Sequence, residues 1–218
     1  MASQTKSKQR VTDHGEVFTA EREVKAMCDL VKQETERIES RFLEPACGNG
    51  NFLAEVLSRK LAVVKSRYGK SPADYEKYSV LAVTSIYGVE LLPDNAAECR
   101  ERLFALWDGA YTANNRQEAD DQCREAVRFI LEKNILCGDA LTLRQADGSP
   151  IIFAEWSLVT GNQIKRRDFA LDELLNGHTE QMTLDMVGWE YDKEVQAFIP
   201  APIREFPLTD YRRVQDYE

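Results

Sequence analysis

Residues 42–53 read Phe42-Leu43-Glu44-Pro45-Ala46-Cys47-Gly48-Asn49-Gly50-Asn51-Phe52-Leu53, and this stretch is the strongest structural signal in the chain. It begins as an apolar, extended run and passes through two glycines. It continues into residues 52–57, whose apolar side chains recur at helical spacing. That order predicts a strand, a tight turn and a helix. Glycine suits such a turn because positive φ costs little there, and because a missing side chain lets backbone amides approach a ligand. The start of the helix adds unpaired N–H groups that attract negative charge.

The composition is that of a globular protein with one domain, or one domain with an appendage: 218 residues, 43% of them hydrophobic. No apolar run approaches the length of a membrane span and the N-terminus is polar, so we expect a soluble, cytoplasmic protein. The net charge of -9 argues against nonspecific electrostatic binding of nucleic acid over a broad surface. Five scattered cysteines and two histidines predict neither a metal site nor a disulfide framework.

The glycine stretch resembles the cofactor motif of S-adenosylmethionine-dependent DNA adenine methyltransferases, written (D/E)-P-A-C-G-(S/T/N)-G-x-F. The matching positions are Glu44, Pro45, Ala46, Cys47, Gly48, Asn49, Gly50 and Phe52. The resemblance implies S-adenosylmethionine as the cofactor, bound by Glu44, Ala46, Gly48 and Gly50. The alternative is a turn that binds another nucleotide or serves the fold alone.

A second string lies upstream, at residues 14–19, where His14-Gly15-Glu16-Val17-Phe18-Thr19 is similar to the family pattern (Y/H)-G-x-(V/F)-(F/Y)-T-P. The resemblance implies that Phe18 and Thr19 contact the methionine moiety, although Ala20 stands where proline is usual. The alternative is a loop with Thr19 as the N-cap of the helix that follows. We expect that helix to run for about 17 residues, with one apolar stripe, after a mobile stretch of about 11 residues at the N-terminus.

Two acidic residues follow further predicted strands. Glu90 ends the β-branched run 80–90, and one carboxylate at a strand end can accept hydrogen bonds from both hydroxyls of a ribose. Asp139 follows the predicted strand 134–137, in a string that resembles the third family motif, whose aspartate binds the adenine amino group. The alternatives are a solvated glutamate that leads a helix and a surface Gly-Asp turn.

The segments between these strands are predicted to be helical. Residues 52–67 form one helix, and Pro72 opens a short one towards residue 78. Two helices at about 94–107 and 116–133, joined by a turn at 110–115, are predicted to form a packed hairpin without chemistry.

The family's catalytic string, (D/N/S)-P-P-(Y/F), is missing, because the chain contains no Pro-Pro pair. In that string, the first residue and a proline carbonyl accept the adenine amino hydrogens, and the aromatic ring stacks on the flipped base. Alternation around Thr160-Gly161-Asn162 instead predicts a β-hairpin with Gly161-Asn162 as its turn. Asn162 is therefore a poor candidate, and the catalytic residues stay unknown.

Beyond the hairpin we expect a helix over residues 171–175 and an extended tail held by Trp189, Tyr191 and Phe198. The cluster Lys165-Arg166-Arg167 is interpreted as a solvated face in preference to a phosphate contact.

These features predict an α/β fold, a Rossmann-like class I methyltransferase sheet with flanking helices. The sheet is truncated to three parallel strands, and a C-terminal β-hairpin and extended tail are added. The expected divisions are an N-terminal arm and helix (1–40), a cofactor-binding core (41–150), and a hairpin, short helix and tail packed on that core (151–218). The resemblance covers about residues 13–143.

The resemblance implies an adenine-N6 DNA methyltransferase-like protein of a restriction-modification system. Two alternatives stay open: a catalytically silent cofactor-binding subunit, and a scaffold that has lost the ligand. Because the chain is acidic, we expect it not to bind DNA alone. A protein partner or a second copy would complete the fold, and no membrane is involved.

Overall fold

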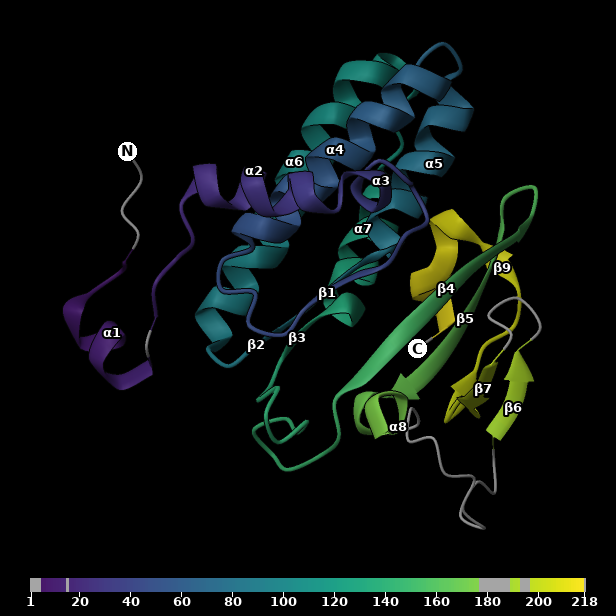
Figure 1. Ribbon diagram of the computed structural model, residues 1–218. Helices are drawn as coiled ribbons and strands as arrows, with labels where there is room; N and C mark the ends of the chain where they lie inside the picture. The colour runs from purple at the N-terminus through teal and green to yellow at the C-terminus, as the bar shows by residue number, and fades with distance from the viewer. Residues whose placement is uncertain (1–4, 15, 177–188, 193–196, 218) are drawn as a thin grey trace.

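A three-stranded parallel sheet with helices packed against it forms the centre of the protein (Figure 1). The computed structural model describes residues 5–14, 16–176, 189–192 and 197–217. Strands β1 (Phe42–Glu44), β2 (Ile86–Glu90) and β3 (Ile135–Cys137) lie in the order β1-β2-β3. Phe42 pairs with Ile86, and Gly88 pairs with Ile135. The three predicted parallel strands are therefore confirmed.

Each crossover between neighbouring strands contains two long helices. Helices α4 (Asn51–Tyr68) and α5 (Pro72–Thr84) connect β1 to β2. Helices α6 (Pro93–Asn115) and α7 (Asp121–Asn134) connect β2 to β3, with the short 3-10 helix η1 (Arg116–Glu118) between them. Helix α5 begins as predicted at Pro72, where Ser71 caps it, but it is longer than expected. It includes the first part of the apolar run 80–90, through Thr84, and β2 occupies the end of that run, where the strand was predicted.

The turn predicted at 110–115 is wrong, since α6 continues through it to Asn115. Tyr111 explains the difference: its ring stacks on Trp107 at 4.7 Å, and its hydroxyl donates to the Glu76 carboxylate. Tertiary packing thus overrides the turn-forming residues nearby. The chain reverses instead at Arg116, where φ is +50°, and Asp120 caps α7.

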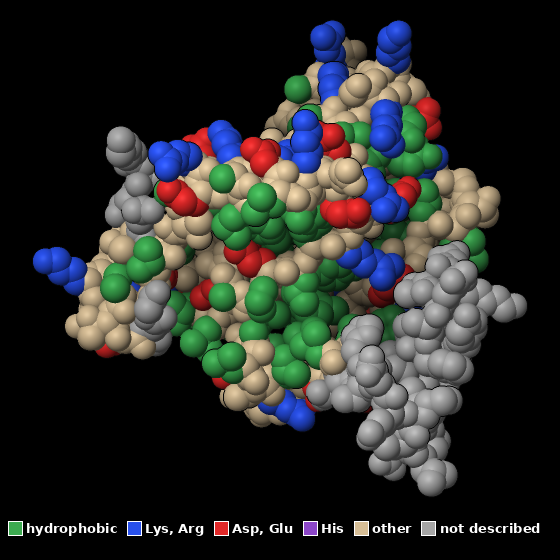
Figure 2. Space-filling view, in the orientation of Figure 1, with side chains coloured by type: hydrophobic (Ala, Val, Ile, Leu, Met, Phe, Trp, Pro, Cys, Tyr) green, Lys and Arg blue, Asp and Glu red, His purple; other side chains and the backbone are tan. Residues whose placement is uncertain are grey.

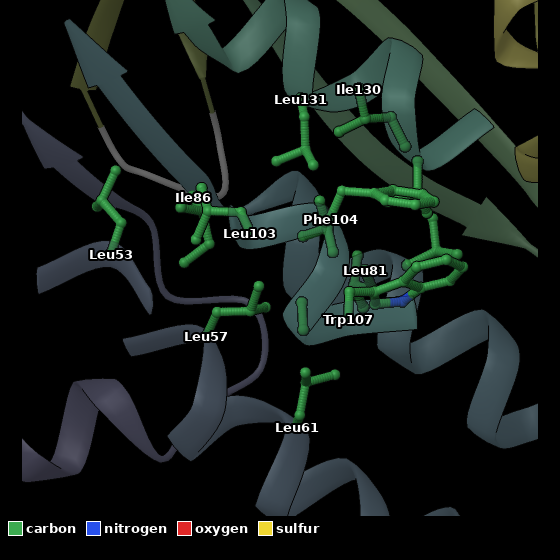
Figure 3. Packing of buried hydrophobic residues seen from close by; sticks show 14 of the residues in the cluster. Leu53, Leu57, Leu61, Leu81, Ile86, Leu103, Phe104, Trp107, Ile130 and Leu131 are labelled. Atoms are coloured by element: carbon green, nitrogen blue, oxygen red, sulfur yellow. The ribbon is translucent and has the colours of Figure 1, made fainter. Parts of the chain in front are cut away.

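One face of the sheet packs on the four long helices. Figure 3 shows this apolar layer, which includes Ile86 of β2 and Trp107 of α6. Trp107 is fully buried, and its indole N–H donates to Ser79 at 3.0 Å. The layer includes Leu53, Leu57, Leu61, Leu81, Leu103, Phe104, Ile130 and Leu131.

The other face of the sheet packs on an antiparallel hairpin. Strands β4 (Ile152–Thr160) and β5 (Gln163–Ala170) pair as predicted, with Gly161 at φ +56° in the turn. Tyr87 of β2 contacts Phe153 edge-on, and its hydroxyl donates to the Ala154 carbonyl at 3.0 Å. The sheet therefore lies between a helical layer and the hairpin.

The remaining C-terminal elements follow the hairpin in order. Helix α8 (Leu171–Asn176) confirms the short helix that was predicted. Strands β6 (Trp189–Asp192) and β7 (Ala197–Pro200) pair with each other, whereas β8 (Arg204–Glu205) and β9 (Thr209–Asp210) each pair antiparallel with β5. The last described element is the 3-10 helix η2 (Tyr211–Tyr217). The anchoring predicted for Trp189, Tyr191 and Phe198 concerns side chains outside the described part of the structure.

The basic cluster in β5 is not a single solvated face. Arg166 is 7% exposed, donates to both carboxylate oxygens of Asp168, and lies over the Phe206 ring at 4.1 Å. Lys165 and Arg167 point to the opposite side, because side chains alternate along a strand. They pair with Glu205 and Glu155.

The N-terminal region also differs from the prediction. Part of the stretch expected to be mobile forms helix α1 (Lys8–His14). The single long helix is broken at Val31 into α2 (Glu21–Leu30) and α3 (Lys32–Thr35). The apolar stripe predicted for this helix comprised Val24, Met27, Cys28, Leu30 and Val31. Only Val24 and Cys28 are buried, whereas the other three side chains are exposed.

Among the described residues, no helix is both long enough and apolar enough to cross a bilayer.

Candidate functional site

The turn between β1 and α4 has a conformation that requires glycine. Gly48 and Gly50 have φ values of +53° and +81°, in the left-handed region where a Cβ is unfavourable. A Cβ on Gly48 would also lie 3.2 Å from the Phe18 ring, and one on Gly50 only 2.6 Å from the Cys99 sulfur. Helix α4 starts directly after Gly50. The predicted order of strand, turn and helix is thus confirmed.

Glu90 is held against this turn. Its Oε2 accepts a hydrogen bond from the Gly48 N–H at 2.8 Å, and its Oε1 accepts one from the Leu92 N–H at 3.0 Å. The parallel pairing of Glu44 with Gly88 places the ends of β1 and β2 side by side. Two acidic residues that are far apart in sequence therefore meet at one edge of the sheet.

Glu44 carries a buried carboxyl oxygen, Oε2, with no hydrogen-bond partner among the described residues. Burial, together with the negative charge of Glu90, raises the pKa of Glu44 to about 8. An unpaired buried polar atom costs about 1–3 kcal/mol. A carboxyl group kept in this state is a candidate acceptor for a ligand, and a cationic ligand group would favour its ionised form.

Phe18 and Thr19 also lie at the turn. The Phe18 ring packs on Gly48, and the Thr19 carbonyl accepts a hydrogen bond from the Asn51 side chain at 3.0 Å. Thr19 is not the N-cap of α2, because Ala20 occupies that position and no side chain caps the helix. The segment before α2 is thus fixed by the turn and not by capping.

Asp139 and Ala46 lie near this site but make no side-chain contact with Glu90 or Glu44 among the contacts described. Asp139 follows β3 at the same edge of the sheet, two residues past Cys137, which pairs with Glu90. Its Oδ1 accepts from the Leu141 N–H at 2.8 Å, a local contact that does not reach the turn. Ala46 lies in the turn with an exposed side chain.

Two further residues connect to Glu90, and neither was predicted to have a role: Glu16, at the variable position of the string 14–19, and Asn95. Glu16 is buried, accepts a hydrogen bond from the Asn95 side chain at 2.6 Å, and pairs with Arg10. Asn95 also donates to Glu90 Oε1 at 3.4 Å. The only sequence feature that could have indicated Asn95 is its position in the first turn of the helix after Glu90. Many residues occupy such positions, so this feature is not specific.

The chemistry of these groups suits an organic ligand that presents hydroxyl groups and positive charge. Two carboxyl groups, Glu44 and Glu90, lie beside the glycine turn, where the Gly48 N–H donates to Glu90 and the Gly50 N–H donates to the Cys47 carbonyl. On the face shown in Figure 2, hydrophobic side chains gather below α2 with acidic side chains among them, which suits a ligand that also has an apolar part. The described residues contain no group of three or more potential metal ligands.

Comparison with known families gives one match. The family model described as MmeI, DNA-methyltransferase domain, matches residues 17–162, which is about two thirds of the chain. The parallel sheet and its helices fit a methyltransferase-like fold. The match continues past residue 143, where we expected the resemblance to end, through β4 and into the hairpin turn. No curated protein and no solved structure matches the chain.

Proposed function

Because the chain belongs to the family of the MmeI DNA-methyltransferase domain, we propose that it binds S-adenosylmethionine at the glycine turn. The family indicates a restriction-modification methyltransferase, and we assign the chain to the adenine-N6 type. The observation that carries the proposal is the pair of carboxyl groups at the turn. Glu90 is bonded to the Gly48 N–H, beside a Glu44 oxygen that has no partner within the described residues.

Each cofactor-binding residue has a role that its chemistry supports. The Glu90 carboxylate would accept hydrogen bonds from the ribose hydroxyls, and Asp139 would accept one from the adenine amino group. Phe18 and Thr19 would contact the methionine moiety, whose positive charges Glu44 would balance. The residues Ala46, Gly48 and Gly50 would let the backbone approach the ligand closely.

The chemistry of such a site needs no covalent intermediate with the protein. S-adenosylmethionine, when bound, supplies an electrophilic methyl group on a positively charged sulfur. The protein's contribution would be to position the ligand, to complement its charge and to exclude water.

A catalytically silent cofactor-binding subunit is the second candidate, and the hairpin favours it. Gly161-Asn162 forms an exposed hairpin turn, and the Asn162 carbonyl accepts a hydrogen bond from the Tyr211 N–H at 3.0 Å. In Figure 1 this turn lies on the opposite side of the molecule from α1. If the chain is such a silent subunit, the group that accepts the adenine amino hydrogens would come from a partner protein or from a second copy of the chain.

Calorimetric titration with S-adenosylmethionine tests the binding step. We expect saturable binding to the full chain, and S-adenosylhomocysteine should compete for the same site. If no heat is measured at saturating cofactor, both binding hypotheses are wrong. The remaining hypothesis is then a scaffold that has lost its ligand.

A second assay separates an enzyme from a silent subunit. Transfer of a radiolabelled methyl group to adenine-containing DNA would be measured for the chain alone and together with its neighbouring gene products. Activity of the chain alone would establish an enzyme, whereas activity only with a partner would establish a subunit. The variant Asn162→Ala is the control, and it should retain whatever activity the wild type has.

A further inference from the structure

Asn95 joins the candidate cofactor site to the N-terminal arm through a buried side-chain amide. We define the N-terminal arm as residues 6–14 and 16–18. Asn95 is 1% exposed, and its Nδ2 donates to Glu16 Oε1 at 2.6 Å and to Glu90 Oε1 at 3.4 Å. Its Oδ1 accepts from the Lys6 ammonium at 2.7 Å. The orientation of the amide is thus determined by charge: its donor end faces two carboxylates and its acceptor end faces a cation.

Ion pairs fasten the N-terminal arm to the first turns of α6. Lys6 pairs with Asp94 at 3.3 Å and with Glu98 at 2.6 Å. Arg10 bridges Glu16 at 2.6 Å and Asp94 at 2.8 Å. The hydrogen bond from Arg10 lowers the pKa of Glu16, and it also lowers the pKa of Asp94 to about 2.

The N-terminal arm reaches the glycine turn by two routes. Its end packs the Phe18 ring directly on Gly48. Its buried Glu16 reaches the same turn indirectly, through Asn95 and then through Glu90, which is bonded to the Gly48 N–H. A change in how the arm is docked would therefore alter the carboxylate that is assigned to the ribose.

We propose that Asn95 is a positioning residue that holds the Glu90 carboxylate for its ligand and couples it to the docking of the N-terminal arm by Arg10. The inference rests on the proposed cofactor site. Because such coupling is reciprocal, cofactor binding should also strengthen docking of the arm.

The charges around Asn95 explain why a neutral amide is needed there. The acidic groups Glu16, Glu90, Asp94 and Glu98, with Glu44 close to Glu90, outnumber the two cations Lys6 and Arg10. An amide can donate to two carboxylates at once without adding charge. Aspartate has nearly the same shape but would add a negative charge when ionised, and it could donate a hydrogen bond only when protonated.

The test is calorimetric titration of the full chain with S-adenosylmethionine at about pH 8 and about pH 5.5. We expect Asn95→Asp to lower the affinity by about tenfold at the higher pH and to recover much of it at the lower pH. The wild type, measured under the same conditions, provides the reference for each pH. Arg10→Met should weaken binding at both pH values, because Glu16 is left buried without its cation.

Arg124→Met is the matched control for Arg10→Met. Arg124 is about as exposed, at 24% against 26% for Arg10, and it also bridges two carboxylates, those of Asp108 and Asp121. The Asp108 pair joins α6 to α7 and the Asp121 pair lies within α7, so neither involves the arm and the affinity should not change.

Three results would overturn the inference. If both variants, Asn95→Asp and Arg10→Met, bind S-adenosylmethionine like the wild type, the inference is wrong and the proposed function still stands. An equal loss at both pH values for Asn95→Asp, with normal binding by Arg10→Met, would reduce Asn95 to a structural role. A wild-type chain that binds no cofactor would overturn the proposed function and this inference with it. If thermal melting shows that Asn95→Asp does not fold, Arg10→Met alone decides, since Arg10 lies on the partly exposed arm.

Discussion

At the residue scale, Glu44 should make the stability of the protein depend on pH. Burial and the nearby charge of Glu90 raise the pKa of Glu44 to about 8, above its ordinary value of 4.5. Between these two values the folded chain keeps a proton that the unfolded chain releases. The free energy of unfolding should therefore fall as the pH rises from about 4.5 to about 8. Urea unfolding across this range should show a smaller fall for Glu44→Gln, and an identical slope in the two proteins would contradict the assignment.

Lys60 is a second buried ionisable residue, and its role is structural. Its ammonium donates to the Ile38 and Ser40 carbonyls and to the Ser85 hydroxyl, and burial lowers the pKa of Lys60 to about 7. Lys60→Met keeps the aliphatic stem but removes the donor to the Ser40 carbonyl and leaves the Ile38 carbonyl with the Ser85 hydroxyl alone, so we expect a loss of about 1–3 kcal/mol in the free energy of unfolding. Denaturant titration would measure it, with the exposed Lys70→Met as the neutral control. Equal stability of the two variants would show that the carbonyls find other partners.

At the element scale, the glycine turn should tolerate substitution poorly, because it combines positive φ with close neighbours. Gly50→Ala would place a methyl group at positive φ and 2.6 Å from the Cys99 sulfur, so we expect a loss of about 1–3 kcal/mol. Gly109→Ala is the matched control, because Gly109 lies inside α6 with open space around its Cβ position. That variant should gain about 0.5–1 kcal/mol, since alanine favours a helix. Urea unfolding would measure the free energy of unfolding of both variants. A similar change in the two variants would contradict the prediction.

At the scale of the whole molecule, the C-terminal segment is anchored to the helical layer through Glu76. This buried carboxylate accepts hydrogen bonds from Tyr111, from Tyr211 at 2.8 Å and from Arg212 at 2.6 Å. Tyr211→Phe removes one of these bonds inside the core, so we expect a loss of about 1–3 kcal/mol in stability without a change in cofactor affinity.

Thermal melting and calorimetric titration of Tyr211→Phe would test both statements. Tyr217→Phe, at a half-exposed position in the same 3-10 helix, should change neither quantity. A loss of cofactor affinity in Tyr211→Phe would show that the C-terminal anchor and the glycine turn are coupled.

Local patterns were sufficient wherever neighbouring residues decide the conformation. The glycines of the turn, Pro72 at the start of α5, and Gly161 in the hairpin all impose backbone geometry that can be read from a few adjacent residues. The glycines predicted the strand-turn-helix and the hairpin, and runs of apolar and β-branched residues predicted the three strands. The family resemblance implied Glu44, and the end of a predicted strand indicated Glu90. The two residues meet because β1 and β2 pair in parallel.

Contacts between distant residues decided the rest. Tyr111 keeps α6 helical through its contacts with Trp107 and Glu76, and Asp168 draws Arg166 into the core. The Glu16–Asn95–Glu90 chain joins three segments that no short window contains. A sequence specifies local backbone preferences directly, whereas the partner of a buried charge depends on which segments folding brings together. For that reason the glycine turn could be found in the printed sequence, and the polar network behind it appeared only in three dimensions.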